Sequence, residues 1–161
     1  MEVVELEYVK IFDNSVKVLL PVCSKDVSMS VLRLKYPSAL RPQIIKTNSE
    51  ETVDFMYNLM NQNIPEESLP VLLSMIKSNI MKQHSGFKFN EQIIKEDENR
   101  NIVWIEYEAP ALDGTMYYIM ALIKLDKLIV QAIYNCDIRN KENCKKVMLR
   151  SINSIRSVEN E

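Results

Sequence analysis

The stretch that decides the fold is 102-IVWIEYEAPALDGTMYYIMALIKLDKLIVQAIYN-135, which holds three runs rich in β-branched, aromatic and aliphatic residues. Asp113-Gly114 separates the first two runs at a turn, because glycine tolerates the positive φ that tight turns need. Asp126-Lys127 offers a two-residue turn between the second and third runs. The stretch therefore predicts a three-stranded antiparallel meander.

The chain length predicts one domain, residues 1–161. A chain of this size buries roughly 70% of its unfolded surface, so it needs no disulfide or metal to hold a core. A net charge of −2 provides no general attraction to nucleic acid. No apolar run approaches the ~18 residues of a membrane span. We therefore expect neither a nucleic acid partner nor a membrane span.

Two features predict a cytoplasmic protein. The first ten residues, MEVVELEYVK, are acidic and alternating, unlike the basic start and continuous apolar core of a signal peptide. The three cysteines, Cys23, Cys136 and Cys144, are an odd number, which would strand one thiol in a secreted chain.

Two segments near the start of the chain predict further strands. Residues 6–12 and 16–20 form a hairpin pattern with 13-DNS-15 at its turn. Residues 31–36 alternate, with Leu32 and Leu34 on one side and Arg33 and Lys35 on the other. That alternation predicts a half-buried strand with a basic outer face.

The middle of the chain predicts the first two helices. The first follows 47-TNSEE-51 and runs to about residue 61, since its apolar residues recur at helical spacing. The second begins near residue 66 or 68 and ends at about His84, with Gly86 as its expected cap. Residues 87–94 then predict a strand.

The third helix is predicted over residues 141–157, after the meander. Grouped strands with helices between the groups favour an α+β fold with an antiparallel sheet. The strands of the meander are apolar on both faces, and such strands are covered on both faces. We expect the first two helices on one face and the third on the other, which makes an α/β/α sandwich.

Four segments give the chain a resemblance to the Mog1/PsbP-like superfamily. They are VLLP at residues 18–21, LKYP at 34–37, GTMYYIMALIKLDKLIV at 114–130, and SINSIRS at 151–157. The resemblance implies an α/β/α sandwich around an antiparallel sheet and a mostly non-enzymatic superfamily. Its members include photosystem assembly factors, Ran-GTPase-binding proteins and bacterial lipoproteins. The chain shows neither a lipobox cysteine nor an acidic segment matching the Ran contact, so neither partner carries over.

Chemical motifs are scarce. The only glycines are Gly86 and Gly114, which excludes the glycine-rich loops that cradle phosphates and dinucleotides, so no cofactor is expected. His84 is the only histidine, and a helix-terminal histidine explains it better than a catalytic base does. Cys136 and Cys144 do not have the spacing of zinc ligands. We predict no catalytic, cofactor or metal site.

Two open questions concern other polar pairs. Glu106 and Glu108 share a strand face with Trp104, as paired acids of a glycosidase could, although a solvated strand edge facing cross-strand lysines is the preferred explanation. Cys136 and Cys144 could form a disulfide only if their Cα atoms lie within about 7 Å.

Charge is segregated along the chain. Residues 25–46 are mainly basic and residues 50–67 are wholly acidic. Complementary patches steer protein partners, whereas the same two segments could instead neutralise each other in the fold. The candidate interaction surface consists of Arg33, Lys35, Arg41, Lys46, Glu50, Glu51 and Asp54.

These observations predict a non-enzymatic protein-interaction or assembly module, whose partner is another protein. It binds through the charged segments or through an open sheet edge. The alternative is a carrier of a small ligand or lipid, with an apolar pocket between sheet and helices lined by Tyr117, Tyr118 and methionines.

Overall fold

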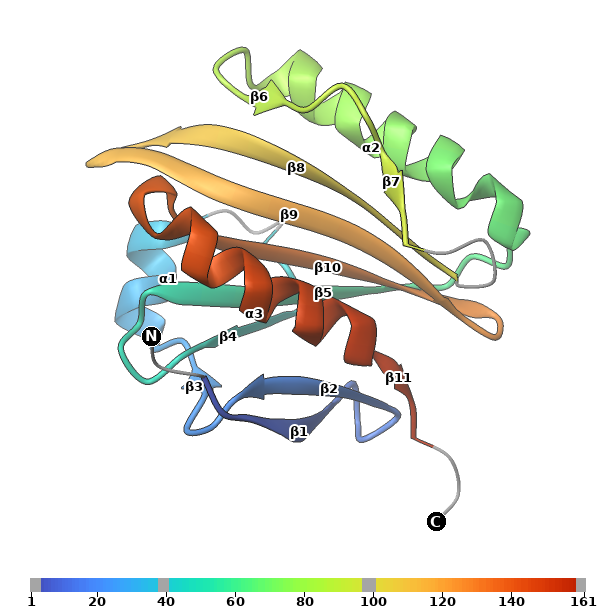
Figure 1. The fold of residues 1–161 in the computed structure, drawn as a ribbon, viewed down its shortest axis with the longest axis horizontal. Helices are drawn as coiled ribbons and strands as arrows, with labels where there is room; N and C mark the ends of the chain where they lie inside the picture. The colour runs from blue at the N-terminus through green and yellow to red at the C-terminus, as the bar shows by residue number, and fades with distance from the viewer. Residues whose placement is uncertain (1–3, 38–40, 97–100, 159–161) are drawn as a thin grey trace.

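A central antiparallel meander runs through the middle of the molecule, as predicted (Figure 1). The computed structural model describes residues 4–37, 41–96 and 101–158. The three strands are β8 (Ile102–Ala111), β9 (Gly114–Leu125) and β10 (Leu128–Asp137). Both expected turns form, and each uses a positive φ, 138° at Gly114 and 54° at Asp126.

The meander extends into an eight-stranded sheet with the order β3-β4-β5-β10-β9-β8-β6, and β7 also pairs with β8. Every pairing is antiparallel. The added strands are β3 (Lys25–Asp26), β4 (Ile44–Thr47), β5 (Val53–Met60), β6 (Lys88–Phe89) and β7 (Ile94–Lys95). A second sheet consists of β1 (Leu6–Ile11), β2 (Val16–Pro21) and β11 (Arg156–Ser157).

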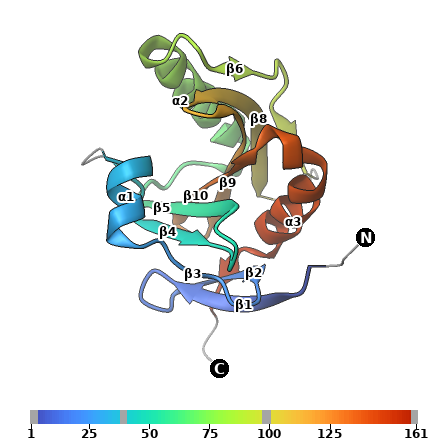
Figure 2. The ribbon, with the colours of Figure 1, turned by 90° about the vertical axis from the view of Figure 1, so that its left-hand side faces the viewer.

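Helices cover both faces of the large sheet, so the α+β sandwich is confirmed. The helices are α1 (Met29–Lys35), α2 (Leu69–Gln83) and α3 (Lys141–Ser154). Figure 2 shows α1 and α2 on one side of the sheet and α3 on the other. No helix in the described part of the chain is both long and apolar enough to cross a membrane.

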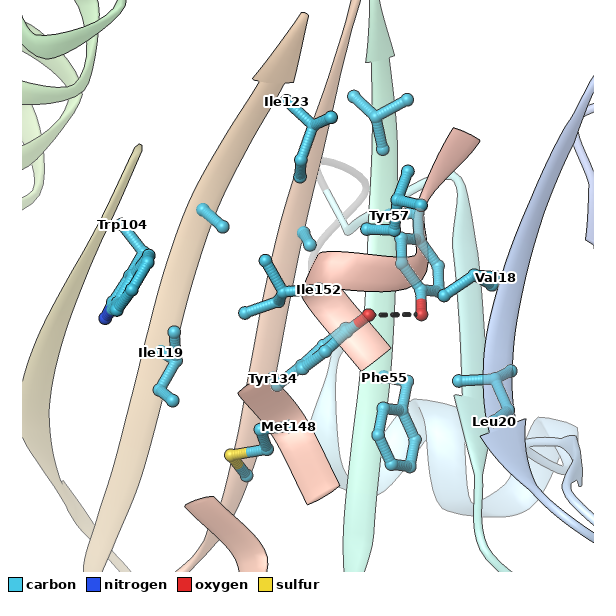
Figure 3. Packing of buried hydrophobic residues seen from close by; sticks show 14 of the residues in the cluster. Val18, Leu20, Phe55, Tyr57, Trp104, Ile119, Ile123, Tyr134, Met148 and Ile152 are labelled. Carbon is cyan, nitrogen blue, oxygen red and sulfur yellow. Dashed lines mark hydrogen bonds between the residues drawn. The ribbon is translucent and has the colours of Figure 1, made fainter. Parts of the chain in front are cut away.

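The largest core lies between the sheet, α3 and the β1–β2 hairpin. Met148 and Ile152 of α3 pack there against strand residues such as Ile119 and Tyr134 (Figure 3). The Tyr57 and Tyr134 hydroxyls meet at 2.6 Å within it, and Tyr134 also contacts the Ser151 hydroxyl at 2.8 Å. These buried hydroxyls thereby satisfy one another.

The segment predicted as a strand at residues 31–36 is instead the helix α1. The Ser28 side chain accepts a hydrogen bond from the Val31 amide and caps its start. Leu32 and Tyr36, four residues apart, then lie on one side of the helix and pack against the cluster of Val27, Ile45 and Met56, the last of which belongs to β5. The alternation in this short run fitted both structures, and packing on β5 favours the helix.

The segment predicted as the first helix is instead β5. It pairs with β4 on one side and with β10 on the other. Its expected helix start is a turn, in which Asn48 Oδ1 accepts hydrogen bonds from the Thr52 and Val53 amides. Most of β5 is buried on both faces, so its sequence does not show the period of two that marks a half-buried strand.

The remaining helices lie near their predicted positions. A 3-10 turn (Glu66–Ser68) leads into α2, with Pro70 in the first turn. His84 rather than Gly86 is its C-cap. The third helix ends at Ser154, because Arg156–Ser157 pairs with β2, and the strand predicted at 87–94 is divided into β6 and β7.

Candidate interaction surface at the α1 edge of the sheet

The predicted site residues gather at one edge of the large sheet, here named the α1 edge: α1, β3, β4 and the turn at residues 48–52. The sheet order places β3, β4 and β5 side by side, and α1 connects β3 to β4. The basic and acidic segments therefore meet here. Arg33 and Lys35 lie on α1, Arg41 precedes β4, Lys46 lies on β4, Glu50 and Glu51 lie in the turn, and Asp54 is in β5.

Several of these charges are paired within the molecule. Lys25 bonds Glu51 at 3.0 Å and Lys35 bonds Asp54 at 3.4 Å, so the basic segment partly neutralises the acidic one. Lys46 pairs with Asp26 of β3 at 2.8 Å. Exposed pairs of this kind contribute about 0–1 kcal/mol and exchange readily with other partners. Arg33 and Glu50 are exposed, and the role of the seven residues as an interaction surface stays a prediction.

Asp54 is the exception, because its side chain is only 2% exposed. The Tyr36 hydroxyl donates a 2.6 Å hydrogen bond to its Oδ2, and Asn135 Nδ2 donates a 2.9 Å bond to that hydroxyl. Burial, reinforced by the Asp54 charge, raises the pKa of Tyr36, so the hydroxyl keeps its proton and stays a donor. Asp54 Oδ1 has no hydrogen-bond partner within residues 4–37, 41–96 and 101–158. The cluster anchors the end of α1 to β5 and β10.

The outer side of α1 is apolar as well as basic. All seven residues of the helix keep some exposed surface, with Met29 60% and Leu34 75% exposed. Met29 and Arg33 are one turn apart on the helix, and Leu34 directly follows Arg33, about 100° further around the helix axis.

A cavity of about 520 Å³ adjoins α1 through Leu32. Its wall is formed by β3, β4 and the β1–β2 turn and combines aliphatic and charged side chains. The charged side chains include Arg41 and Lys46 of the predicted surface, and Asp26, which pairs with Lys46.

Three solved structures share this architecture over nearly the whole chain. Cyanobacterial PsbP (CyanoP) from Synechocystis aligns with a TM-score of 0.66 and 9% identity, covering 98% of this chain and 95% of that one. The Ran-binding protein Mog1p from Saccharomyces cerevisiae aligns with a TM-score of 0.60 and 9% identity, covering 95% of each chain. The fold is Mog1/PsbP-like.

LpqN from Mycobacterium tuberculosis, described as involved in cell envelope biogenesis, has the same Mog1/PsbP-like fold. It aligns with a TM-score of 0.55 and 8% identity, covering 97% of this chain and 92% of that one. No family model and no curated protein matches the amino-acid sequence. At these identities the likeness establishes the Mog1/PsbP-like fold and leaves partner and activity to other arguments.

The paired carboxylates on β8 separate into two environments in this Mog1/PsbP-like sheet. Glu106 is buried beside α3, where it accepts a hydrogen bond from the Tyr117 hydroxyl and pairs with Lys145 at 2.9 Å. Burial favours its protonated form, but the hydrogen bonds from Tyr117 and Lys145 outweigh burial and lower the pKa of Glu106. A general acid needs the opposite shift, so Glu106 is not suited to serve as the acid of such a pair.

The arrangement of the two tyrosines does not favour the carrier alternative. Tyr117 and Tyr118 are neighbours in β9 and point to opposite faces of the sheet, toward α3 and toward the α1–α2 side. They cannot line one pocket between the sheet and a helix.

His84 is exposed and stacks on Phe87 with ring centroids 4.8 Å apart.

The structure brings Cys136 and Cys144 together, although the sequence left their distance open. Cys144 packs against the core cluster that contains Cys136, and their interaction raises the pKa of Cys136 and lowers the pKa of Cys144. All three cysteines are free thiols. The described residues contain no group of three or more His, Cys, Asp or Glu side chains that could hold a metal ion.

Proposed function

We propose that this protein is a non-enzymatic, cytoplasmic interaction module that binds another protein through the α1 edge. The observation that carries the proposal is the exposure of α1, on which Met29, Arg33 and Leu34 all reach the surface. An apolar anchor beside an arginine is the combination that recurs at the centres of protein interfaces.

The surroundings of α1 fit this role. The charges beside it form a rim whose ion pairs are exposed enough to be exchanged for pairs with a partner. The Tyr36–Asp54 contact holds the helix in place before a partner arrives, which lowers the entropy cost of binding. The Ran-binding protein Mog1p shares the fold, which is consistent with a protein partner and does not specify which one.

The test compares two leucines. Leu34 on α1 and Leu112 in the β8–β9 turn are 75% and 95% exposed, so replacing either with glutamate leaves the core intact. The wild-type protein, Leu34→Glu and Leu112→Glu are each used as bait in native lysate at low salt. We expect at least one protein that the wild type and Leu112→Glu retain and that Leu34→Glu loses.

A second variant tests the charge contribution. Arg33→Glu is expected to weaken capture of the same protein and to reduce the salt dependence of binding. If the wild type and Leu34→Glu capture identical sets of proteins, or if nothing is captured reproducibly, the α1 edge is not the binding surface.

A further inference from the structure

Two thiols from different elements meet beneath a surface cavity on the α3 side of the sheet. Cys136 lies in β10, directly opposite Val53 of β5, and is fully buried. Cys144 lies in the first half of α3 and is partly exposed. Cys144 and Val53 both line a cavity of about 350 Å³, which opens between α3, the 48–52 turn and the end of β2. Solvent therefore reaches Cys144, while Cys136 lies behind it in the core.

The interaction between the two thiols gives them different pKa values. The hydrogen bond that Cys136 donates to Cys144, together with burial, raises the pKa of Cys136. The same hydrogen bond lowers the pKa of Cys144 despite its partial burial. The thiolate is the nucleophilic form of cysteine. Cys144 is therefore the reactive thiol, and Cys136 is the thiol that keeps its proton.

We propose that Cys144 is a hydroperoxide-sensitive thiol and that Cys136 resolves its oxidised form into a reversible disulfide. The proposal goes beyond the interaction function, since it concerns a redox reaction of two thiols on the α3 face of the sheet. It rests on the packing of Cys144 against the core cluster that contains the buried Cys136, and on the cavity that admits a small oxidant to Cys144.

The chemistry balances with a hydroperoxide as the oxidant. The Cys144 thiolate attacks the peroxide O–O bond, which yields a sulfenic acid and hydroxide; the hydroxide takes up a proton and becomes water. The Cys136 sulfur then attacks the Cys144 sulfur, the S–S bond forms, and the sulfenic hydroxyl leaves with the Cys136 proton as a second water. Two thiols and one hydrogen peroxide thus give one disulfide and two waters, and an external dithiol reverses the reaction.

The fold favours this pair over other thiols. Cys144 packs against the core cluster that contains Cys136, so the two cysteines are already neighbours before a bond of about 2 Å forms. The linked segment is short, because only residues 137–143 separate the two cysteines. The bond would clamp the start of α3 to the end of β10. Cys23, on the exposed β2–β3 connection, serves as the internal comparison.

The experiment uses the folded full chain, reduced and then treated with a small excess of hydrogen peroxide. Peptide mapping by mass spectrometry without reduction is expected to show a peptide pair joined through Cys136 and Cys144, lighter by two hydrogens. A dithiol should restore both free thiols. Cys23→Ser should give the same product, whereas a link between Cys23 and Cys144, or oxidation confined to Cys23, would overturn the proposal.

A second variant tests the division of roles. Cys136→Ala keeps the buried site apolar, and circular dichroism verifies that the variant is folded. With Cys136 absent, the sulfenic acid cannot be resolved, so dimedone should label Cys144 several-fold more than in the wild type. Alkylation of Cys144 by iodoacetamide should also shift to higher pH, because its hydrogen-bond donor is gone. Equal dimedone labelling in the folded variant and the wild type would show that Cys136 is not the resolving thiol.

Discussion

The Tyr36 hydroxyl donates a 2.6 Å hydrogen bond to Asp54 Oδ2, which joins the residue after α1 to the second residue of β5. Asn135 of β10 donates to the same hydroxyl at 2.9 Å. A residue within the basic segment and a residue of the acidic segment thus meet inside the molecule. This contact explains both the position of α1 and the burial of Asp54.

Removing that contact is expected to destabilise the protein. Tyr36→Phe leaves the buried Asp54 carboxylate without its shortest hydrogen bond, which costs about 1–3 kcal/mol of unfolding free energy. Urea unfolding followed by the fluorescence of Trp104, the only tryptophan, measures the loss. Tyr8→Phe is the matched control, because Tyr8 is 46% exposed, and should change stability by less than about 0.5 kcal/mol. Equal effects in the two variants would contradict the prediction.

Alkaline pH is expected to destabilise the protein through the buried tyrosines. Burial raises the pKa of both Tyr57 and Tyr134 above the ordinary value of 10.0. The unfolded chain loses these protons near pH 10 and the folded chain keeps them, so stability is unaffected below about pH 10 and falls above it. Each group contributes at most about 1.4 kcal/mol per pH unit.

The slope of the unfolding free energy against pH identifies the tyrosines that are responsible for the loss of stability. Tyr57→Phe and Tyr134→Phe should each give a shallower loss of unfolding free energy above about pH 10. Phe55→Leu is a control that weakens the same core while it keeps both phenols, so its slope should equal that of the wild type. An unchanged slope in both tyrosine variants would assign alkaline unfolding to other groups.

Acid stability is expected to depend on Glu106. Tyr117 and Lys145 bind the charged form, and they hold the pKa of Glu106 below its ordinary value of 4.5 against the opposing effect of burial. Its contribution is therefore complete above about pH 4.5 and is lost as the pH falls through the lower folded value.

Glu106→Gln tests this contribution. The variant should lose about 1–2 kcal/mol of unfolding free energy at neutral pH and show a weaker decline in acid. Glu108→Gln, two residues along the same strand face and less buried, should stay within about 0.5 kcal/mol of the wild type. Parallel acid profiles for Glu106→Gln and the wild type would refute the assignment.

Gly114 is expected to be required for its backbone conformation alone. Its φ is 138°, which side-chain-bearing residues rarely adopt, yet a Cβ added there would meet no atom within 4 Å. Gly114→Ala should therefore cost about 1–3 kcal/mol through strain. At Gly86 the new Cβ would lie 3.1 Å from Pro110 Cγ, so Gly86→Ala tests a steric effect instead. A neutral Gly114→Ala in thermal unfolding would count against a strained turn.

Part of the candidate site could be predicted from the sequence. The charged segments that meet at the α1 edge could be recognised from the sequence alone, because the charge of a side chain follows directly from its residue type. The burial of Asp54 was not, since it depends on Tyr36, which lies 18 residues before Asp54, and on Asn135, which lies 99 residues after Tyr36. The Cys136–Cys144 contact depends in the same way on how α3 returns to the sheet.

The sequence by itself determined the meander, the hairpin, α2 and α3, because turn residues and hydrophobic periods act over a few neighbouring positions. Only the tertiary structure decided α1 and β5. Val53, Met56, Tyr57 and Met60 fit a helical spacing, and residues 31–36 fit a strand alternation. Pairing of Tyr57 with Ala132 in β10 and packing of Leu32 on Met56 reversed both assignments. In short segments local preferences amount to less free energy than the burial and hydrogen bonding that distant partners supply.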